Sequence, residues 1–68
     1  MEWAMTQNNL VAVELAFFEK NGLSIHLDRA QGYADAAHEV FEVGGASHYL
    51  AIVQRQRYEI AARRAAIS

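Results

Sequence analysis

The fold is decided by residues 37–53, which read AHEVFEVGGASHYLAIV. Gly44-Gly45 ends one periodic segment and is followed by another, and glycine readily adopts the left-handed conformation that ends many helices. Proline, the other strong helix breaker, is absent from the whole chain of 68 residues. The segment therefore predicts two helices joined by a tight turn, in the form of an antiparallel hairpin.

A second glycine signal, Asn21-Gly22, separates this hairpin from the start of the chain. Ser24 and Ser47 each stand two residues beyond such a glycine, where a helix N-cap is expected. We predict three helices, at about residues 6–20, 25–43 and 48–67. Gly32 lies inside the second of them, where it costs about 1 kcal/mol relative to alanine, and we interpret it as a point of close helix approach.

The second and third predicted helices carry stripes whose residues recur at steps of three and four, as one face of an α-helix requires. The stripe of the second helix is Leu27, Ala30, Ala34, Ala37 and Phe41, and that of the third is Tyr49, Val53, Gln56, Ile60, Arg63 and Ile67. Folding about the turn places residues whose numbers sum to about 90 opposite each other, such as Phe41 and Tyr49, and small residues then face large ones. The same register predicts two ion pairs, Asp35 with Arg55 and Asp28 with Arg63.

Other faces are apolar as well, which predicts more packing than one hairpin provides. The first helix has a stripe of Leu10, Val13 and Phe17, widened by Val11, Leu15 and Phe18, and the third has a second face of Leu50, Ala51, Tyr58, Ala61, Ala62 and Ala65. A chain this short buries little surface by itself. We predict one all-α domain over residues 1–68, in which the first helix, a second protomer or both cover the third helix, and which is completed as a homodimeric helical bundle.

One alternative fold starts from the alternation of apolar and polar residues over 23–27, LSIHL. A short strand there, followed by two helices, is the order of a ribbon-helix-helix repressor. This strand would carry no basic residue to contact DNA, and the first helix would be an additional element. The three-helix interpretation is therefore favoured.

The composition excludes several classes of function. Cysteine is absent, so disulfides, zinc-thiolate sites and thiol catalysis are excluded. The sequence starts without the basic and apolar regions of a signal peptide, and no apolar run reaches the length of a membrane span, so we expect a cytoplasmic protein. No glycine-rich phosphate loop or nucleophile motif occurs, so we predict no catalytic residues, no cofactor and no enzymatic activity.

A metal site is the alternative to this non-catalytic interpretation. His38 and Glu42 are four residues apart, Asp35 lies one turn earlier, and His48 lies just across the Gly-Gly turn. Metal sites use this spacing, but so do many solvated helix faces, and no companion motif is present. We therefore predict no metal ligands.

Charge is divided unevenly along the chain, whose net charge is −2. Glu39 and Glu42 fall in the last predicted turn of the second helix, where the negative end of the helix dipole disfavours carboxylates. Arg57 and Arg64 lie seven residues apart on one flank of the third helix. The position of Glu39 and Glu42 breaks a local rule of helix electrostatics, and such violations often mark functional positions. We predict Glu39, Glu42, Arg57 and Arg64 as the partner-binding site.

The sequence thus favours a small regulatory or inhibitory protein that binds another protein through a helical surface. Accessory inhibitors of phages and mobile elements often act in this way. The alternative is a dimeric nucleic-acid-binding regulator, similar to a repressor or an antitoxin, that uses the arginine-rich third helix. An acidic chain makes this alternative weaker, because nucleic-acid binders normally carry a basic excess.

Overall fold

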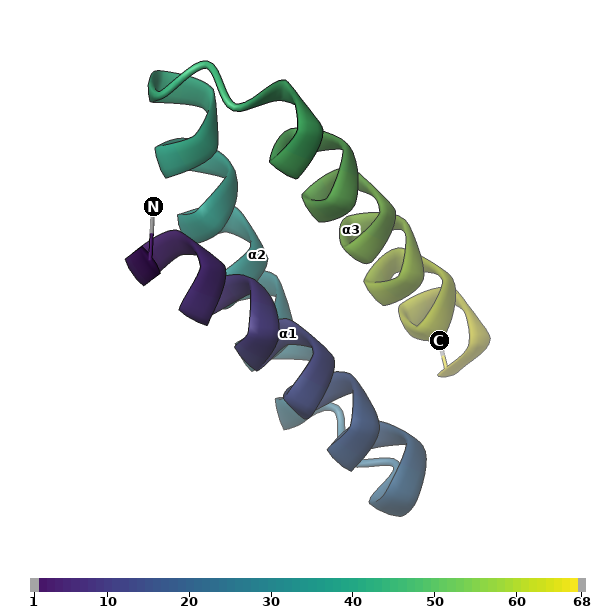
Figure 1. The fold of residues 1–68 in the computed structure, drawn as a ribbon. Helices are drawn as coiled ribbons and strands as arrows, with labels where there is room; N and C mark the ends of the chain where they lie inside the picture. Colours follow the sequence, from purple (N-terminus) through teal and green to yellow (C-terminus); the bar gives the residue numbers. More distant parts are fainter. Residues whose placement is uncertain (1, 68) are drawn as a thin grey trace.

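The computed structural model describes residues 2–67, which form three α-helices (Figure 1). The helices are α1 (Glu2–Asn21), α2 (Ile25–Val43) and α3 (Ser47–Ile67). The all-α prediction is confirmed: α2 has the predicted bounds, α1 begins earlier than predicted and α3 begins one residue earlier. Within the described residues, none of these helices combines the length and the apolar content that a membrane span requires.

Both turns contain a glycine in the left-handed region, as predicted. The φ angles of Gly22 and Gly45 are 69° and 68°. The backbone N–H of Gly22 donates a 2.7 Å hydrogen bond to the carbonyl of Phe18, which satisfies an acceptor at the end of α1. Gly44 remains right-handed, with a φ of −80°, so Gly45 alone reverses the chain in the second turn.

The two predicted serine caps behave differently from the prediction. Ser24 is the N-cap residue of α2, but its side chain forms no capping hydrogen bond, and its carbonyl accepts the N–H of Leu27 at 2.9 Å. Ser47 is already the first residue of α3, so its prediction as an N-cap is wrong by one residue. The strand alternative over 23–27 is also wrong, because Ile25 to Leu27 form the first turn of α2.

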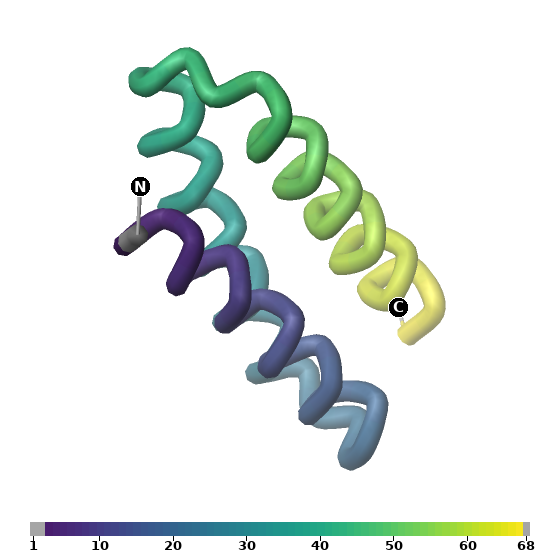
Figure 2. The backbone as a smooth tube through the Cα atoms, viewed as in Figure 1, coloured from purple at the N-terminus to yellow at the C-terminus, as the bar shows by residue number. Residues whose placement is uncertain are grey.

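The central helix is α2, and the other two helices run antiparallel to it (Figures 1 and 2). Contact between α1 and α3 is slight, and the Cα atoms span 34 × 19 × 14 Å, so the bundle is broader than it is deep. As a result α1 does not cover the back of α3, where 77% of Tyr58 is exposed. Of the two coverings predicted for this face, the one by α1 is therefore wrong, and the one by a second protomer stays a prediction.

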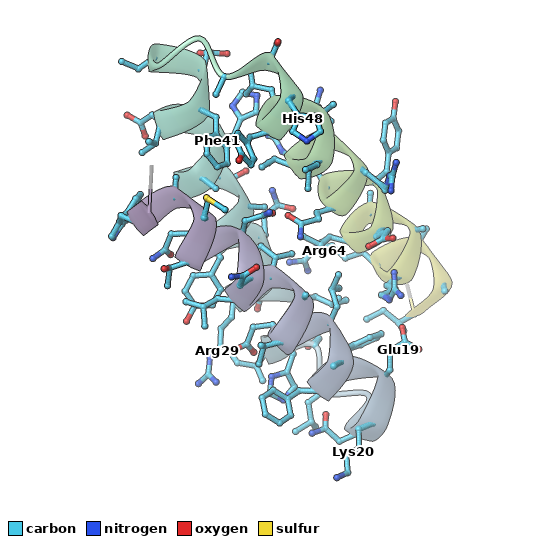
Figure 3. All side chains as sticks on the ribbon, in the orientation of Figure 1. Glu19, Lys20, Arg29, Phe41, His48 and Arg64 are labelled. Atoms are coloured by element: carbon cyan, nitrogen blue, oxygen red, sulfur yellow. The ribbon has the colours of Figure 1, made fainter. Side chains whose placement is uncertain are left out.

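The core follows the stripe predicted on α2. All five of its members are buried: Leu27, Ala30, Ala34, Ala37 and Phe41. Val53 and Ile60 of the α3 stripe are fully buried as well, whereas Ile67 is exposed, contrary to the prediction. Phe41 points inward from α2 (Figure 3), and its ring stacks on Tyr49 with the centroids 5.0 Å apart, as the hairpin register predicts.

On α1 the structure reverses the predicted roles of the apolar residues. Val11 and Leu15, expected only to widen the stripe, are buried in the core together with Ala4. Leu10, Val13 and Phe17, expected to form the main stripe, turn outward, and Val13 and Phe17 are 44% and 47% exposed. Trp3 lies seven residues before Leu10 and is also exposed. We call Trp3, Leu10, Val13 and Phe17 the α1 outer stripe.

Gly32 does not mark a close approach between helices of this chain. A Cβ added at this position would meet no atom within 4 Å, and its φ lies outside the left-handed region. Replacing Gly32 with alanine is expected to raise the free energy of unfolding by about 1 kcal/mol, because alanine loses less backbone entropy in a helix. Urea unfolding followed by circular dichroism measures this change.

The matched control for Gly32→Ala is Gly45→Ala. It also adds one methyl group to open space, but at a positive φ. The left-handed conformation costs a residue with a Cβ about 1–2 kcal/mol, so this variant is expected to be less stable than the parent. Equal changes in both variants would contradict the backbone conformations described here.

Candidate functional site

The two arginines predicted to bind a partner are engaged within the chain. Arg57 Nη2 lies 3.3 Å from Asp35 Oδ1, and Arg64 Nη2 lies 2.7 Å from Asp28 Oδ1. The predicted ion pairs of these aspartates with Arg55 and Arg63 are therefore wrong. All four side chains are partly exposed, so each pair contributes at most about 1 kcal/mol to stability. The pairs nevertheless offset the positive charge on this flank of α3.

Arg63 also has a partner, which lies on α1. Its guanidinium donates to the carboxylate of Glu19 and to the backbone carbonyl of Glu59. Figure 3 shows Glu19 extending from the end of α1 toward the last turns of α3. Within residues 2–67, Arg55 is the arginine of α3 that has no ion pair.

The two acidic candidates, unlike the arginines, are not paired with another described side chain. Glu39 and Glu42 are exposed in the last two turns of α2, and neither carboxylate forms an ion pair with another described residue. Val43, the last residue of α2, is 85% exposed. Glu39 is four residues before Val43 and three before Glu42, so these side chains neighbour one another on the helix surface. We call Glu39, Glu42 and Val43 the acidic end of α2.

Val43 was not a candidate in the sequence analysis. Its neighbour Phe41 belongs to the buried stripe, and position 43 lies about 200° around the helix from it. The register of that stripe could have placed Val43 on the outside. A valine at the exposed end of a helix is not a conspicuous sequence signal, and only its 85% exposure draws attention to it.

The residues considered for a metal site do not form one in the described part of the chain. Among residues 2–67, no three histidine, aspartate or glutamate side chains lie close enough together to hold a metal ion. Asp35 is occupied by Arg57 and by the side-chain amide of Gln31, which donates a 2.8 Å hydrogen bond to it. His48 lies edge-on against Tyr49, with the ring centroids 5.3 Å apart. The candidate ligands are thus not brought to a common centre.

A buried hydrogen-bonded contact between α1 and α2 was missed by the sequence analysis. His26 Nδ1 lies 2.7 Å from Glu14 Oε1, and the two side chains are only 12% and 10% exposed. The His26 ring also stacks on Phe17 at a centroid distance of 5.4 Å, and its Nε2 lies 3.5 Å from the amide nitrogen of Asn21. The Glu14 carboxylate accepts a hydrogen bond from Nδ1–H of His26, and the Asn21 amide is placed to donate one to Nε2. These two contacts orient the ring.

The sequence contains a signal for this contact. Glu14 stands between Val11, Leu15 and Phe18, which are the residues of α1 that face the core. A carboxylate in such a position must find a partner, because burying an unpaired charge is costly. His26 reaches it from the first turn of α2. His26 lies beside the turn between α1 and α2 and stacks on Phe17, and its contact with Glu14 is nearly buried. We therefore interpret the pair as structural.

Two further polar side chains lie between α1 and α3. The Gln56 amide donates a 3.2 Å hydrogen bond to the backbone carbonyl of Asn8. Gln56 Oε1 and Asn8 Oδ1 are buried and accept no hydrogen bond from the described residues. This contact explains how a polar residue fits in the α3 stripe, where Gln56 faces α1 as well as α2.

A surface hollow lies on α3. Its volume is about 300 Å³, and its walls are formed by Gln54, Arg57, Tyr58 and Ala61. These residues supply no pair of acid and base and no nucleophile next to a base. The hollow is a feature of one exposed helix face without a catalytic arrangement.

Comparison with known proteins adds no relative to this description: no protein-family model, curated protein or solved structure matches the chain.

Proposed function

We propose that this chain is a non-enzymatic regulatory or inhibitory protein of the cytoplasm that binds another protein through the acidic end of α2. The partner that fits this surface is a basic protein with an apolar contact for Val43. In this function the chain would resemble the accessory inhibitors of phages and mobile elements, and it would act as a homodimer. Arg57 and Arg64 would then support the surface only indirectly, through their pairs with α2.

The observation that carries the proposal is the exposure of Val43 beside two unpaired carboxylates. An apolar side chain that is 85% exposed gains free energy when a partner covers it, by about 25 cal/mol for each Å² removed from water. Glu39 and Glu42 lie at the negative end of the helix dipole, which makes the local potential more negative still. A cationic partner is therefore attracted, and the apolar contact holds it.

The nucleic-acid alternative has less support. Three of the four arginines on α3 pair with carboxylates of the same chain, so α3 presents little net positive charge. Phosphate binding would require these pairs to open, while an acidic chain repels the phosphate backbone. If nucleic acid were nevertheless the partner, the protein would be retained on a nucleic-acid column at low salt and released steeply as salt increases.

Site-specific photocrosslinking in the native host tests the protein-binding proposal. A photoreactive amino acid replaces Val43 in one variant and Ala62, an exposed residue on the back of α3, in the control variant. We expect the first variant to form an adduct with one basic protein, identified by mass spectrometry, and the control to form none. Equal adducts at both positions would contradict the proposal.

Charge reversal provides the quantitative part of this test, with the identified partner as the ligand. Glu39→Lys combined with Glu42→Lys is expected to weaken binding by about 10- to 100-fold, because like charges then face the basic partner. Glu59→Lys on α3 is the control: its carboxylate also forms no ion pair within residues 2–67, but it is distant in sequence from the acidic end. An affinity that is unchanged by the double reversal would overturn the proposal.

A further inference from the structure

The α1 outer stripe brings together three of the large apolar side chains that are exposed among the described residues. Trp3, Val13 and Phe17 are 55%, 44% and 47% exposed, and Leu10 is half-buried between them. The opposite side of the same helix already supplies Val11 and Leu15 to the core. A helix that is apolar on two sides is normally covered on two sides.

The α1 outer stripe contains no charged residue, and the nearby carboxylates of Glu14 and Glu19 are paired within the chain. Each of the two glutamates in the middle and end of α1 is held by another helix of the chain, Glu14 by His26 and Glu19 by Arg63. Lys20 projects from the C-terminal end of the helix (Figure 3). Between residues 3 and 17, the outward face therefore presents no unpaired carboxylate among the described side chains that would make two copies of an acidic chain repel each other.

The spacing of the stripe suits pairing with itself. Trp3, Leu10 and Phe17 are seven residues apart, and Val13 stands three after Leu10, which is the pattern of a seam between two helices. An interface with two-fold symmetry must be complementary to itself. We propose that a second copy of this chain packs its α1 outer stripe, antiparallel, against this one. The inference rests on the proposed homodimer and is independent of the acidic end of α2.

Antiparallel pairing centred between Leu10 and Val13 has three favourable consequences. Leu10 packs against the partner's Val13, and the symmetry repeats this contact. Trp3 comes to lie beside the partner's Lys20, whose ammonium can approach the indole face. The positive end of each helix dipole lies next to the negative end of the other, which parallel pairing does not provide.

The area of the stripe indicates a dimer that forms at moderate concentration. Trp3 and Phe17 together leave about 200 Å² of aromatic surface open, given that each aromatic side chain has roughly 150–250 Å² to bury. A stable interface buries about 800 Å² on each partner, which is more than these aromatic side chains supply. The stripe therefore forms the apolar centre of the interface, and polar residues around it supply the remaining area. The back of α3 is less suitable, because Gln54 and Arg57 lie beside Tyr58 there and its alanines offer little area.

Sedimentation equilibrium from micromolar to millimolar protein tests the proposal. The mass of the parent is expected to rise from 7.6 kDa toward twice that value as the concentration increases. Val13→Lys should raise the dimer dissociation constant at least about 100-fold, because each interface then buries two unpaired ammonium groups. Lysine is a better helix former than valine, so circular dichroism should show the monomer of this variant intact. Ala62→Lys, on the back of α3, should dimerise like the parent.

The single tryptophan gives an independent readout of the same surface. Emission of Trp3 is expected to shift to shorter wavelength as the parent dimerises, and to stay constant in Val13→Lys. A parent that stays monomeric throughout would overturn both the homodimer and this interface. A dimer that persists in Val13→Lys, or that is lost in Ala62→Lys, would overturn only the assignment to α1. None of these results bears on the photocrosslinking at position 43.

Discussion

Replacing Phe41 with alanine is expected to lower the free energy of unfolding by about 3–5 kcal/mol. Phe41 is fully buried, and it is the largest such side chain of the described residues. The substitution removes its stack on Tyr49 and leaves a cavity between α2 and α3 that neighbouring alanines are too small to fill. Domains have only about 0.05–0.15 kcal/mol of stability per residue, which is about 3–10 kcal/mol for a chain of 68 residues, so the loss is about a third of the total or more. The midpoint of unfolding should fall sharply.

Circular dichroism with urea, at one fixed protein concentration, measures this loss. Phe41→Leu keeps much of the volume and is expected to cost clearly less than Phe41→Ala. Tyr58→Ala is the matched control, because it also truncates an aromatic side chain, but one that is 77% exposed on α3. That change should stay within about 0.5 kcal/mol. Similar losses for Phe41→Ala and Tyr58→Ala would contradict the hairpin core described here.

The buried face of α2 was predictable from the spacing of its apolar residues. Its stripe of three alanines between Leu27 and Phe41 recurs at helical spacing, and all of it is buried. On α1 the same reasoning chose the wrong face. Both faces of α1 are apolar, and which of them is buried depends on Glu14, whose partner His26 lies in the next helix. A periodicity argument within one helix does not include such a contact.

The ion pairs between α2 and α3 show a similar limit. The hairpin register was correct for Phe41 and Tyr49, yet Asp35 pairs with Arg57 and not with Arg55. Side chains on a helix lean toward its N-terminus, so a long arginine reaches a level N-terminal to its own Cα. Because α3 runs antiparallel to α2, this brings Arg57 to the level of Asp35. Cα registers therefore predict apolar contacts better than contacts of long charged side chains.

Of the candidate site, the sequence indicated the two glutamates but not the apolar residue beside them. Glu39 and Glu42 were identifiable because carboxylates at the C-terminal end of a helix oppose its dipole. The register of the α2 stripe is compatible with an outward Val43, but a valine at a helix end is no conspicuous sequence signal, and its 85% exposure is evident only in the structure. The arginines had to be placed in space before their pairing with Asp28 and Asp35 became evident.

Replacing His26 with alanine is expected to lower the free energy of unfolding by about 2–3 kcal/mol. The change removes the stack on Phe17 and leaves the carboxylate of Glu14, only 10% exposed, without its partner. Removing one partner of a buried hydrogen bond costs more than the bond contributes when intact, since the remaining carboxylate keeps its desolvation penalty. His48→Ala is the control, because His48 is exposed and has no carboxylate partner in residues 2–67.

A double-mutant cycle separates this explanation from a simple loss of packing. Glu14→Leu and His26→Leu each leave one polar group of the pair buried, so each single variant should be less stable than the parent. The double variant replaces both groups by apolar side chains and should recover most of the loss, because replacing both partners of a buried hydrogen bond by apolar groups can be nearly neutral. A coupling of about 1.5 kcal/mol or more is therefore expected from urea unfolding of the four proteins. Additive losses would mean that His26 and Glu14 do not depend on each other, and that burial of Glu14 against the core has another cause.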